Sequence, residues 1–316
     1  MTKLNQVQFK TISEDNFQQR IDNYLVTLLK GVPKSHIYRI LRKGEVRVNK
    51  KRVKAPYKLQ IGDVVRIPPI KLPEKQDVNV PNVKLDKVQQ LENAILYETD
   101  NLIVLNKPSG MAVHGGSGLS FGVIEALRQL RPEARFLELV HRLDRDTSGC
   151  LLIAKKRSAL RFMHEQLRDK KMHKHYVALV DGSWPKKTKV VTAPLLKNTL
   201  KSGERVVKVD QQGKASETRF SIREKFDHAT LIECSPITGR THQIRVHTLY
   251  VGCSIIGDAK YTDESVNQKY EQSFNFSRLF LHAESITFKE QKKEKKITIK
   301  APLDDTMESL LVRLRG

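Results

Sequence analysis

The chain has 316 residues, of which 39% are hydrophobic, so its length and composition predict a globular protein with a buried core. Its net charge of +22 indicates an anionic partner, and we expect nucleic acid rather than an anionic membrane surface. No apolar run approaches the roughly 20 residues of a membrane-spanning helix, and the N-terminus lacks the apolar core of a signal peptide. The sequence therefore predicts a cytoplasmic protein that does not cross or bind a membrane.

The cysteines and histidines argue against a disulfide framework and a metal site. Cys150, Cys234 and Cys253 contain no CxxC pair, so we expect buried free thiols in a reducing compartment. His242 and His247 do not have the spacing of a helical zinc pair, and no cysteine ligands flank them. We predict no structural metal.

Two helices are expected near the N-terminus. Residues 15–30 place apolar side chains on a helical stripe, with Ser13 or Asp15 as the N-cap. A second, shorter helix is expected to begin at a Ser35 cap and to end at Gly44.

Strand patterns follow these helices. EVRVNKKRV, residues 45–53, alternates like a hairpin with a turn at Asn49 and Lys50. LQIGDVVRIP, residues 59–68, predicts another hairpin, with a turn at Gly62 and Asp63.

Positive charge is concentrated on the second helix and the first hairpin. Between Lys30 and Lys54 there are ten Lys or Arg residues and a single acid, Glu45. A charge run is often only a solvated surface, but a compact basic surface also suits a phosphate backbone. The stretch VPKSHIYRILRKGEVRVNKKRV resembles an S4-type RNA-binding domain. We expect eight of its residues to contact RNA: Lys34, Arg39, Arg42, Lys43, Arg47, Lys50, Lys51 and Arg52.

Four prolines in residues 68–92 indicate a stiff, extended segment. The predicted organisation is therefore an RNA-binding domain at 1–70, a linker at 71–92 and a second domain at 93–316. In the second domain, strand patterns often follow one another without an intervening helix, which favours an α+β fold with a mixed, largely antiparallel sheet over a doubly wound fold.

The expected elements of this domain fall in the following stretches. The hairpin is ILYETDNLIVLNKP (95–108), and the helices are FGVIEALRQL (121–130), RSALRFMHEQLRDKK (157–171) and THQIRVHTLYVG (241–252). The further strands are CLLIAKK (150–156), HYVALVDG (175–182), SETRFSI (216–222), ATLIECSPI (229–237) and RLFLHAESITF (278–288).

A glycine-rich loop, NKPSGMAVHGGSG at 106–118, could cradle a phosphate or close over a sheet edge, and its composition does not decide between them. The P-loop pattern GxxxxGK[ST] and the dinucleotide pattern GxGxxG are both absent, which disfavours nucleotide enzymes of those two kinds.

A second stretch, HRLDRDTSG at 141–149, places Asp144 between Arg142 and Arg145, just before a buried strand. Its short polar residues and glycine are typical of a turn. Alternatively, the two arginines hold an ionised Asp144 beside an anionic substrate. Such a carboxylate could act as nucleophile, as base, or as electrostatic partner of an oxocarbenium ion. Asp146 is so close in sequence that we expect it to be structural rather than a second catalytic acid.

Two further stretches contain candidate partners for Asp144. On a strand, Lys174, Tyr176 and Ala178 share one face, and Tyr176 is either a core residue or a platform on which an unpaired base stacks. Thr241 is expected to cap the helix at 241–252. His242 and Arg245 share a face of that helix, and a buried arginine needs a partner, for which Asp144 is the obvious choice.

Taken in order, NKPSGMAVHGG, HRLDRDTSG, KHYVALV and GRTHQIRVH resemble the RluA-type pseudouridine synthases, and the resemblance extends over nearly the whole chain. It implies the pseudouridine synthase fold for residues 93–316. It also implies that Asp144 is the catalytic aspartate, that Tyr176 stacks on the uracil and accepts a proton from C5, and that Arg245 pairs with the aspartate. Arg142, with His141 beside it, is expected near the flipped nucleotide.

The implied activity is the isomerisation of specific uridines in 23S ribosomal RNA to pseudouridine. The base is flipped out, the N1–C1′ bond is cleaved and the base is rejoined through C5. The reaction changes neither composition nor redox state, so we expect no cofactor. The implied partner is large-subunit ribosomal RNA, and the expected state is a monomer.

Two other functions remain as alternatives. A non-enzymatic RNA-binding or ribosome-assembly factor would explain the charge and the S4-like stretch, but it gives no reason for Asp144, Tyr176 and Arg245. A phosphate-ester hydrolase would call for metal-ligand carboxylates or a histidine pair, which the sequence does not offer.

Overall fold

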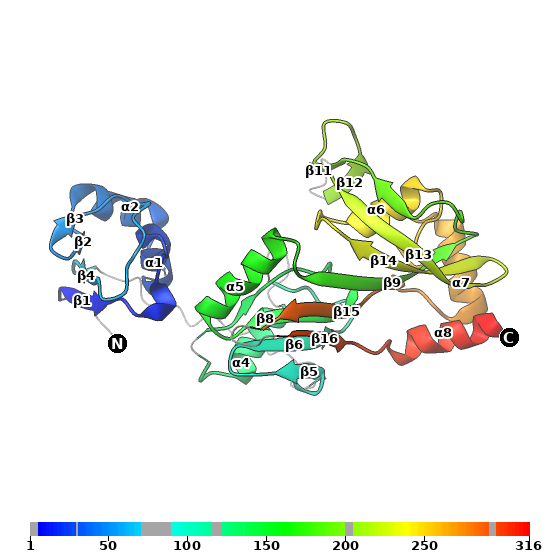
Figure 1. Cartoon of the computed structure of the whole chain (residues 1–316), viewed down its shortest axis with the longest axis horizontal. Helices are drawn as coiled ribbons and strands as arrows, with labels where there is room; N and C mark the ends of the chain where they lie inside the picture. Colours follow the sequence, from blue (N-terminus) through cyan, green and yellow to red (C-terminus); the bar gives the residue numbers. More distant parts are fainter. Residues whose placement is uncertain are drawn as a thin grey trace. The chain divides into compact units, whose positions relative to one another are not determined.

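A computed structural model of the chain describes residues 6–29, 31–70, 90–115, 122–134, 136–199, 205–290 and 295–316. The chain divides into two compact units, Met1–Val83 and Lys84–Gly316, and each is described by itself. Figure 1 labels their helices and strands. Of the predicted linker at 71–92, residues 71–89 lie outside the described residues.

The N-terminal unit combines two helices with a four-stranded antiparallel sheet. The helices are α1 (Ile21–Leu28) and α2 (Lys34–Lys43), preceded by a short 3-10 helix, η1 (Glu14–Asn16). The strand order is β1-β4-β2-β3, with β1 at Gln8–Thr11, β2 at Arg47–Val48, β3 at Lys51–Arg52 and β4 at Val64–Ile67. Their apolar side chains form one buried cluster, which includes Ile21, Leu25, Ile37 and Val65.

Two predictions for this unit are wrong. Helix α1 begins only at Ile21, so neither Ser13 nor Asp15 caps it, because the preceding residues form η1 and a turn. Residues 59–68 contain one strand, β4, instead of a hairpin. The residues before β4 turn around the Asp63 carboxylate, which accepts hydrogen bonds from the Gln60 amide (2.9 Å) and the Tyr57 hydroxyl (2.9 Å).

The predicted second helix and first hairpin are confirmed. Helix α2 starts after Pro33 rather than at a Ser35 cap, and it ends at Gly44, whose φ of 72° is left-handed. Between β2 and β3, Asn49 and Lys50 have φ values of 48° and 67°. Two successive positive φ values are typical of the type I′ turn of a tight hairpin.

The C-terminal unit is built on a ten-stranded sheet in which only the β15–β8 pair is parallel. The path is β10-β13-β14-β9-β15-β8-β6-β5, with β16 paired to β15 and β7 paired to β8. The bounds are β5 (Ile95–Glu98), β6 (Leu102–Lys107), β7 (Glu138–Leu139), β8 (Ser148–Ala154), β9 (His173–Asp181), β10 (Val190–Thr192), β13 (Glu217–Lys225), β14 (Ala229–Pro236), β15 (Leu281–Lys289) and β16 (Lys296–Lys300). This topology confirms the predicted α+β class with a mixed, largely antiparallel sheet.

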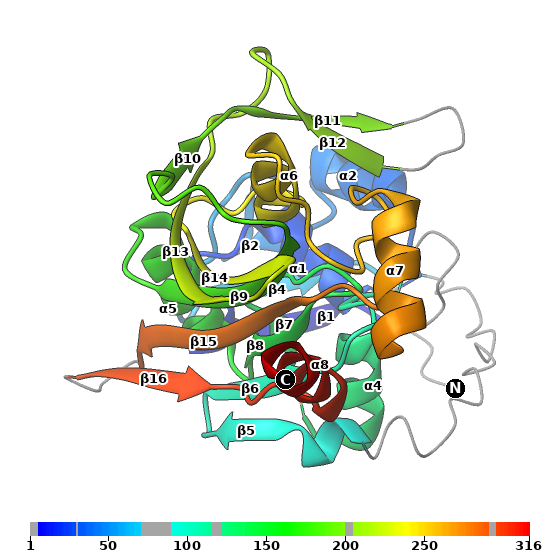
Figure 2. The same cartoon turned by 90° about the vertical axis from the view of Figure 1, so that its right-hand side faces the viewer.

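Helices and a separate hairpin accompany the sheet in the described part of this unit. The helices are α4 (Val123–Leu130), α5 (Arg157–Arg168), α6 (Gln243–Tyr250), α7 (Glu264–Phe274) and α8 (Asp305–Arg315), and the hairpin is β11 (Leu195–Thr199) with β12 (Arg205–Val209). The predicted helices α4, α5 and α6 are confirmed, whereas α7, α8 and the hairpin were not predicted. Figure 2 shows α6 within the curve of β13 and β14, beneath β11 and β12, and α6 contacts β12, β13 and β14.

The core of this unit includes every residue of β8 and residues 176–180 of β9. Cys150, Cys234 and Cys253 are buried free thiols, as predicted, and burial raises the pKa of each. No helix in the described part of the chain has the length and apolar character to cross a membrane.

Candidate active site

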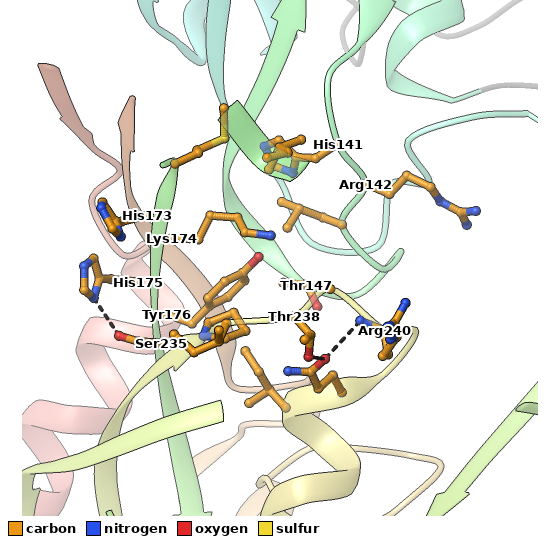
Figure 3. A pocket seen from close by; sticks show the side chains of 18 of the residues that line it. His141, Arg142, Thr147, His173, Lys174, His175, Tyr176, Ser235, Thr238 and Arg240 are labelled. Carbon is orange, nitrogen blue, oxygen red and sulfur yellow. Dashed lines mark hydrogen bonds between the residues drawn. The ribbon is translucent and has the colours of Figure 1, made fainter. Parts of the chain in front are cut away.

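A cavity of about 980 Å³ opens where the loop before β8, the start of β9 and the loop between β14 and α6 meet (Figure 3). Asp144 comes from the first of these segments, Tyr176 from the second, and Arg245 from the first turns of α6. The three residues singled out in the sequence are therefore brought to one cavity.

The glycine-rich loop braces the Asp144 loop. The Lys107 amino group, at the end of β6, is fully buried and donates to the carbonyl oxygens of Pro108 (2.7 Å), Met111 (2.8 Å) and Arg145 (2.9 Å). The Ser109 hydroxyl donates to the Asp146 carbonyl at 2.8 Å. The described part of this loop, 106–115, therefore lies against the backbone that carries Asp144. The rest of the predicted loop, 116–118, lies outside the described residues.

The last glycine of HRLDRDTSG has a specific steric role. Gly149 has a φ of 104°, and a Cβ there would lie 2.3 Å from the Ala283 carbonyl oxygen. Ser148 and Gly149 are the residues through which β8 pairs in parallel with β15. Glycine is therefore required for the close approach of the two strands directly after the Asp144 loop.

Among the described residues, the basic side chains that pair with the Asp144 carboxylate come from α6 and its N-cap instead of from its neighbours in sequence. Arg245 Nη1 lies 3.5 Å from Asp144 Oδ2, and His242 Nε2 lies 3.9 Å from the same oxygen. The expectation that Arg142 and Arg145 hold this carboxylate is wrong. Arg145 Nε pairs with Asp146 at 3.1 Å, and the exposed Arg142 forms no ion pair with any described carboxylate, because residues next to one another in a turn point in different directions.

Arg245 has a second, closer partner that the sequence analysis missed. Its Nε donates to Asp258 Oδ2 at 2.7 Å and its Nη2 donates to Asp258 Oδ1 at 2.6 Å, and both residues are buried. Its guanidinium also lies 4.9 Å from the centre of the Tyr261 ring. Burial lowers the pKa of Arg245, but the hydrogen bonds and charge of Asp258 and the charge of Asp144 outweigh it and raise the pKa above its usual value.

His242 joins this group through an unusual backbone position. It is the N-cap residue of α6 with a left-handed φ of 52°, and its side chain makes no cap hydrogen bond. The prediction that Thr241 caps this helix is therefore wrong. His242 Nδ1 lies 2.7 Å from the Tyr261 hydroxyl, and burial lowers the pKa of the imidazole although the charge of Asp144 opposes this.

Tyr176 projects from β9 into the cavity, with Lys174 on the same face of the strand (Figure 3). The Tyr176 side chain is largely buried, and burial, followed by the charge of Asp144, raises the pKa of its hydroxyl. His141 also lines the cavity. Its Nε2 accepts a hydrogen bond from the Leu152 amide at 3.2 Å, its Nδ1 has no partner among the described residues, and burial lowers its pKa to about 3.

The eight basic residues predicted to contact RNA form what we call the basic face of the N-terminal unit. All are exposed, and none forms an ion pair with a carboxylate of the described residues. Helix α2 and the β2–β3 hairpin adjoin one another, because Arg52 Nη2 donates to the Arg42 carbonyl at 2.8 Å and Arg47 Nε donates to the Gly44 carbonyl at 3.3 Å.

No group of three or more His, Cys, Asp or Glu side chains suited to a metal ion occurs in the described ranges.

Comparison with known proteins finds two family models. One, described as RNA pseudouridylate synthase, matches residues 101–250, and one for the S4 domain matches residues 19–65. The ribosomal large subunit pseudouridine synthase C of Pasteurella multocida is 63% identical over 309 residues, which are 98% of this chain and 94% of that protein. The protein of the same name from Escherichia coli is 59% identical over 316 residues, or 100% of this chain and 99% of that protein.

Among solved structures, human RNA pseudouridylate synthase domain containing 4 superposes with a TM-score of 0.59 at 26% identity, covering 73% of this chain and 96% of that one. The matches in sequence and in structure confirm the resemblance predicted from the four motifs and from the S4-like stretch.

Proposed function

The chain belongs to the RNA pseudouridylate synthase family, and on this premise we propose that it isomerises specific uridines of large-subunit (23S) ribosomal RNA to pseudouridine. The choice of RNA is supported by relatives at 59% and 63% identity that are named for the large ribosomal subunit and align over nearly their full length. The observation that carries the chemistry is the cavity in which Asp144 faces Arg245 and Tyr176.

Asp144 is the residue to which we assign the central step. Cleavage of the N1–C1′ bond develops positive character at C1′, and a carboxylate in a site closed to bulk water is suited to stabilise it, to attack C1′ or to remove a neighbouring sugar proton. Arg245 Nη1, at 3.5 Å, places a positive charge near the carboxylate without forming a close bidentate pair with it. We assign to the aromatic ring of Tyr176 the role of holding the detached uracil by stacking while it turns.

The target base must leave its stacked position to enter the cavity, at a cost of roughly a few kcal/mol. Contacts between the phosphate backbone and the basic face offset that cost, because each neutralised phosphate releases counterions. Arg142, exposed beside the cavity, and His141 are assigned to the RNA that flanks the flipped nucleotide. In this proposal residues 1–70 bind RNA, residues 93–316 carry out the isomerisation, and the chain acts as a monomer in the cytoplasm.

The test uses large-subunit ribosomal RNA in which uridine carries tritium at C5, since pseudouridine formation releases that tritium to water. We expect the parent chain to release tritium and Asp144→Asn to release none above background while still binding the RNA. Asp146→Asn is the matched control, because Asp146 is partly exposed, pairs only with Arg145 among the described residues and lies two residues away. Normal turnover by Asp144→Asn, or no turnover by the parent chain, would refute the proposal.

A further inference from the structure

Lys174 lines the cavity and has no hydrogen bond or ion pair with any residue of the described ranges. It lies on β9 two residues before Tyr176, and its Nζ is 3.9 Å from the position that a Cβ on Gly239 would occupy. The side chain therefore reaches from β9 to the loop that precedes α6. Figure 3 shows its amino group and the Tyr176 hydroxyl directed into the same part of the cavity.

The surroundings of Lys174 lower the pKa of its amino group. The carboxylates that line the cavity are Asp144 and Glu217, and neither pairs with Lys174. The other positively charged side chains that line it are those of Arg142, Lys170, Arg219, Arg240 and Arg245. Burial lowers the pKa of Lys174 below its usual value, because no nearby carboxylate of the described residues compensates for the lost hydration.

The proposed reaction needs a proton acceptor at this place. Once C5 has bonded to C1′, it still carries its hydrogen, which must leave as a proton so that the electron pair restores the C5–C6 double bond. Tyr176 is a neutral phenol whose pKa is raised, so it can accept that proton only if it gives up its own. His141 is a poor final acceptor of this proton, because its pKa is about 3 and its Nε2 already accepts a hydrogen bond from the Leu152 amide.

The remaining imidazoles of the cavity are also less suited. His175 Nδ1 is bonded to the Ser235 hydroxyl at 2.8 Å, and His175 and His173 are exposed at the start of β9. His242 lies beside Asp144 and is bonded to Tyr261. Lys174 is the basic group that shares a strand face with Tyr176 and has no other partner among the described residues.

We propose that Lys174 is the final acceptor of the proton that leaves C5 of the uracil, with the Tyr176 hydroxyl as the relay. The proton passes from C5 to the Tyr176 oxygen as the hydroxyl proton passes through one bridging water to Lys174 Nζ, so the phenol and the water are unchanged and the amine becomes an ammonium ion. The ammonium ion returns its proton to water when the product leaves. This inference rests on the proposed function, since it concerns a late step of the same isomerisation.

The test compares ribosomal RNA containing ordinary uridine with RNA containing uridine deuterated at C5, in single-turnover reactions of the full-length chain. In Lys174→Met the loss of C5–H becomes the slowest step. We expect pseudouridine formation about 10²-fold slower than in the parent chain, together with a larger deuterium isotope effect. Tyr176→Phe interrupts the relay and should also increase the isotope effect. Lys171→Met is the control, because Lys171 is exposed and pairs with Asp169 at 3.2 Å.

Lys174→Arg separates proton transfer from charge. Arginine has a similar length but stays protonated in proteins, so it cannot accept the proton, and we expect it to be as slow as the methionine variant. Lys174→Gln repeats the measurement with a polar side chain, and thermal unfolding verifies that each variant is folded.

Three results would overturn the inference: a parental rate in Lys174→Met, a slow rate without the larger isotope effect, or recovery in Lys174→Arg. RNA binding by Lys174→Met offers a further check. If Lys174 instead contacted a phosphate of single-stranded RNA, this variant would lower the slope of log affinity against log salt by about 0.7. Absence of tritium release by the parent chain would refute the proposed function itself, so the two failures are distinguishable.

Discussion

Arg245 makes its two short hydrogen bonds to Asp258, at 2.7 and 2.6 Å, and turns only its remaining nitrogen, Nη1, toward Asp144, at 3.5 Å. The buried Asp258 therefore determines where the guanidinium lies. The Asp144 carboxylate lies near the positive charge of Arg245, and its side chain remains 31% exposed to the cavity. This division of one arginine between two carboxylates is the relationship on which the geometry of the site depends.

Asp258→Ala is expected to damage both stability and turnover. Removing one partner of a buried ion pair costs about 3–5 kcal/mol, because the other charge loses its compensation. Arg245 would then be free to turn fully toward Asp144. Denaturant unfolding and tritium release measure the two effects, with Asp305→Ala as an exposed control at the start of α8. Parental stability and activity in Asp258→Ala would contradict the role given to this residue.

The basic face should determine how RNA affinity depends on salt. Replacing both Arg42 and Lys43 by Gln is expected to reduce the slope of log affinity against log salt by about 0.7 to 0.9 for each phosphate that the variant no longer neutralises. Binding of ribosomal RNA fragments at several salt concentrations measures this slope. Lys10→Gln is the control, because Lys10 is exposed on β1, which carries none of the eight residues. An unchanged slope in the double variant would argue against RNA binding at this face.

His141 should make stability depend on pH in the acidic range. Its pKa falls from 6.5 to about 3 because of burial, so between these values the unfolded chain binds a proton that the folded chain does not. The contribution of the neutral, buried His141 to the free energy of unfolding is complete above about pH 6.5. It is lost as the pH falls toward about 3, by at most about 1.4 kcal/mol for each pH unit.

His141→Gln keeps an acceptor for the Leu152 amide but cannot titrate. Its unfolding free energy should therefore decrease less steeply than that of the parent chain when the pH is lowered over this range. Urea unfolding at successive pH values tests this, and parallel curves for the two proteins would show that His141 does not titrate as described.

Gly149→Ala is expected to destabilise the C-terminal unit by about 1–3 kcal/mol through overpacking, since the new Cβ would lie 2.3 Å from the Ala283 carbonyl oxygen. Its positive φ adds strain for any residue with a side chain. Gly182→Ala is an instructive comparison, because Gly182 also has a positive φ but nothing in the described structure lies within 4 Å of the added carbon. If the two variants were equally stable, crowding against β15 would not be the reason for this glycine.

The elements that the sequence predicted well have patterns that do not depend on distant residues. Strands β8 and β9 are apolar runs bounded by polar residues, and α4 and α5 carry amphipathic stripes. Helix α8 was missed although Asp304 gives a usable signal, since its side chain accepts a hydrogen bond from the Met307 amide. Helix α1 was predicted too long because the apolar stripe continues through residues that η1 and a turn occupy.

For the site, the motifs were informative about which residues meet, but not about how their charges pair. Asp144, Tyr176 and Arg245 each belong to a recognisable stretch, and all three line one cavity. Asp258 and Tyr261 follow α6 on a loop that folds back onto it, so their contacts with Arg245 depend on tertiary packing. Spacing in the sequence does not indicate that this loop returns to α6. It also does not indicate in which direction neighbouring side chains of a turn point, and the pairing of Arg142 and Arg145 with Asp144 was therefore predicted wrongly.

Strand β15 lies between β9 and β8, although it follows them by about a hundred residues in the chain. Tyr176 and the loop of Asp144 are therefore joined through a segment that leaves the ribosome late during translation. Such non-local pairing is expected to slow folding. An unfinished chain that ends before residue 281 would carry the basic face without an assembled pocket, so nascent protein could bind RNA before it was able to modify it.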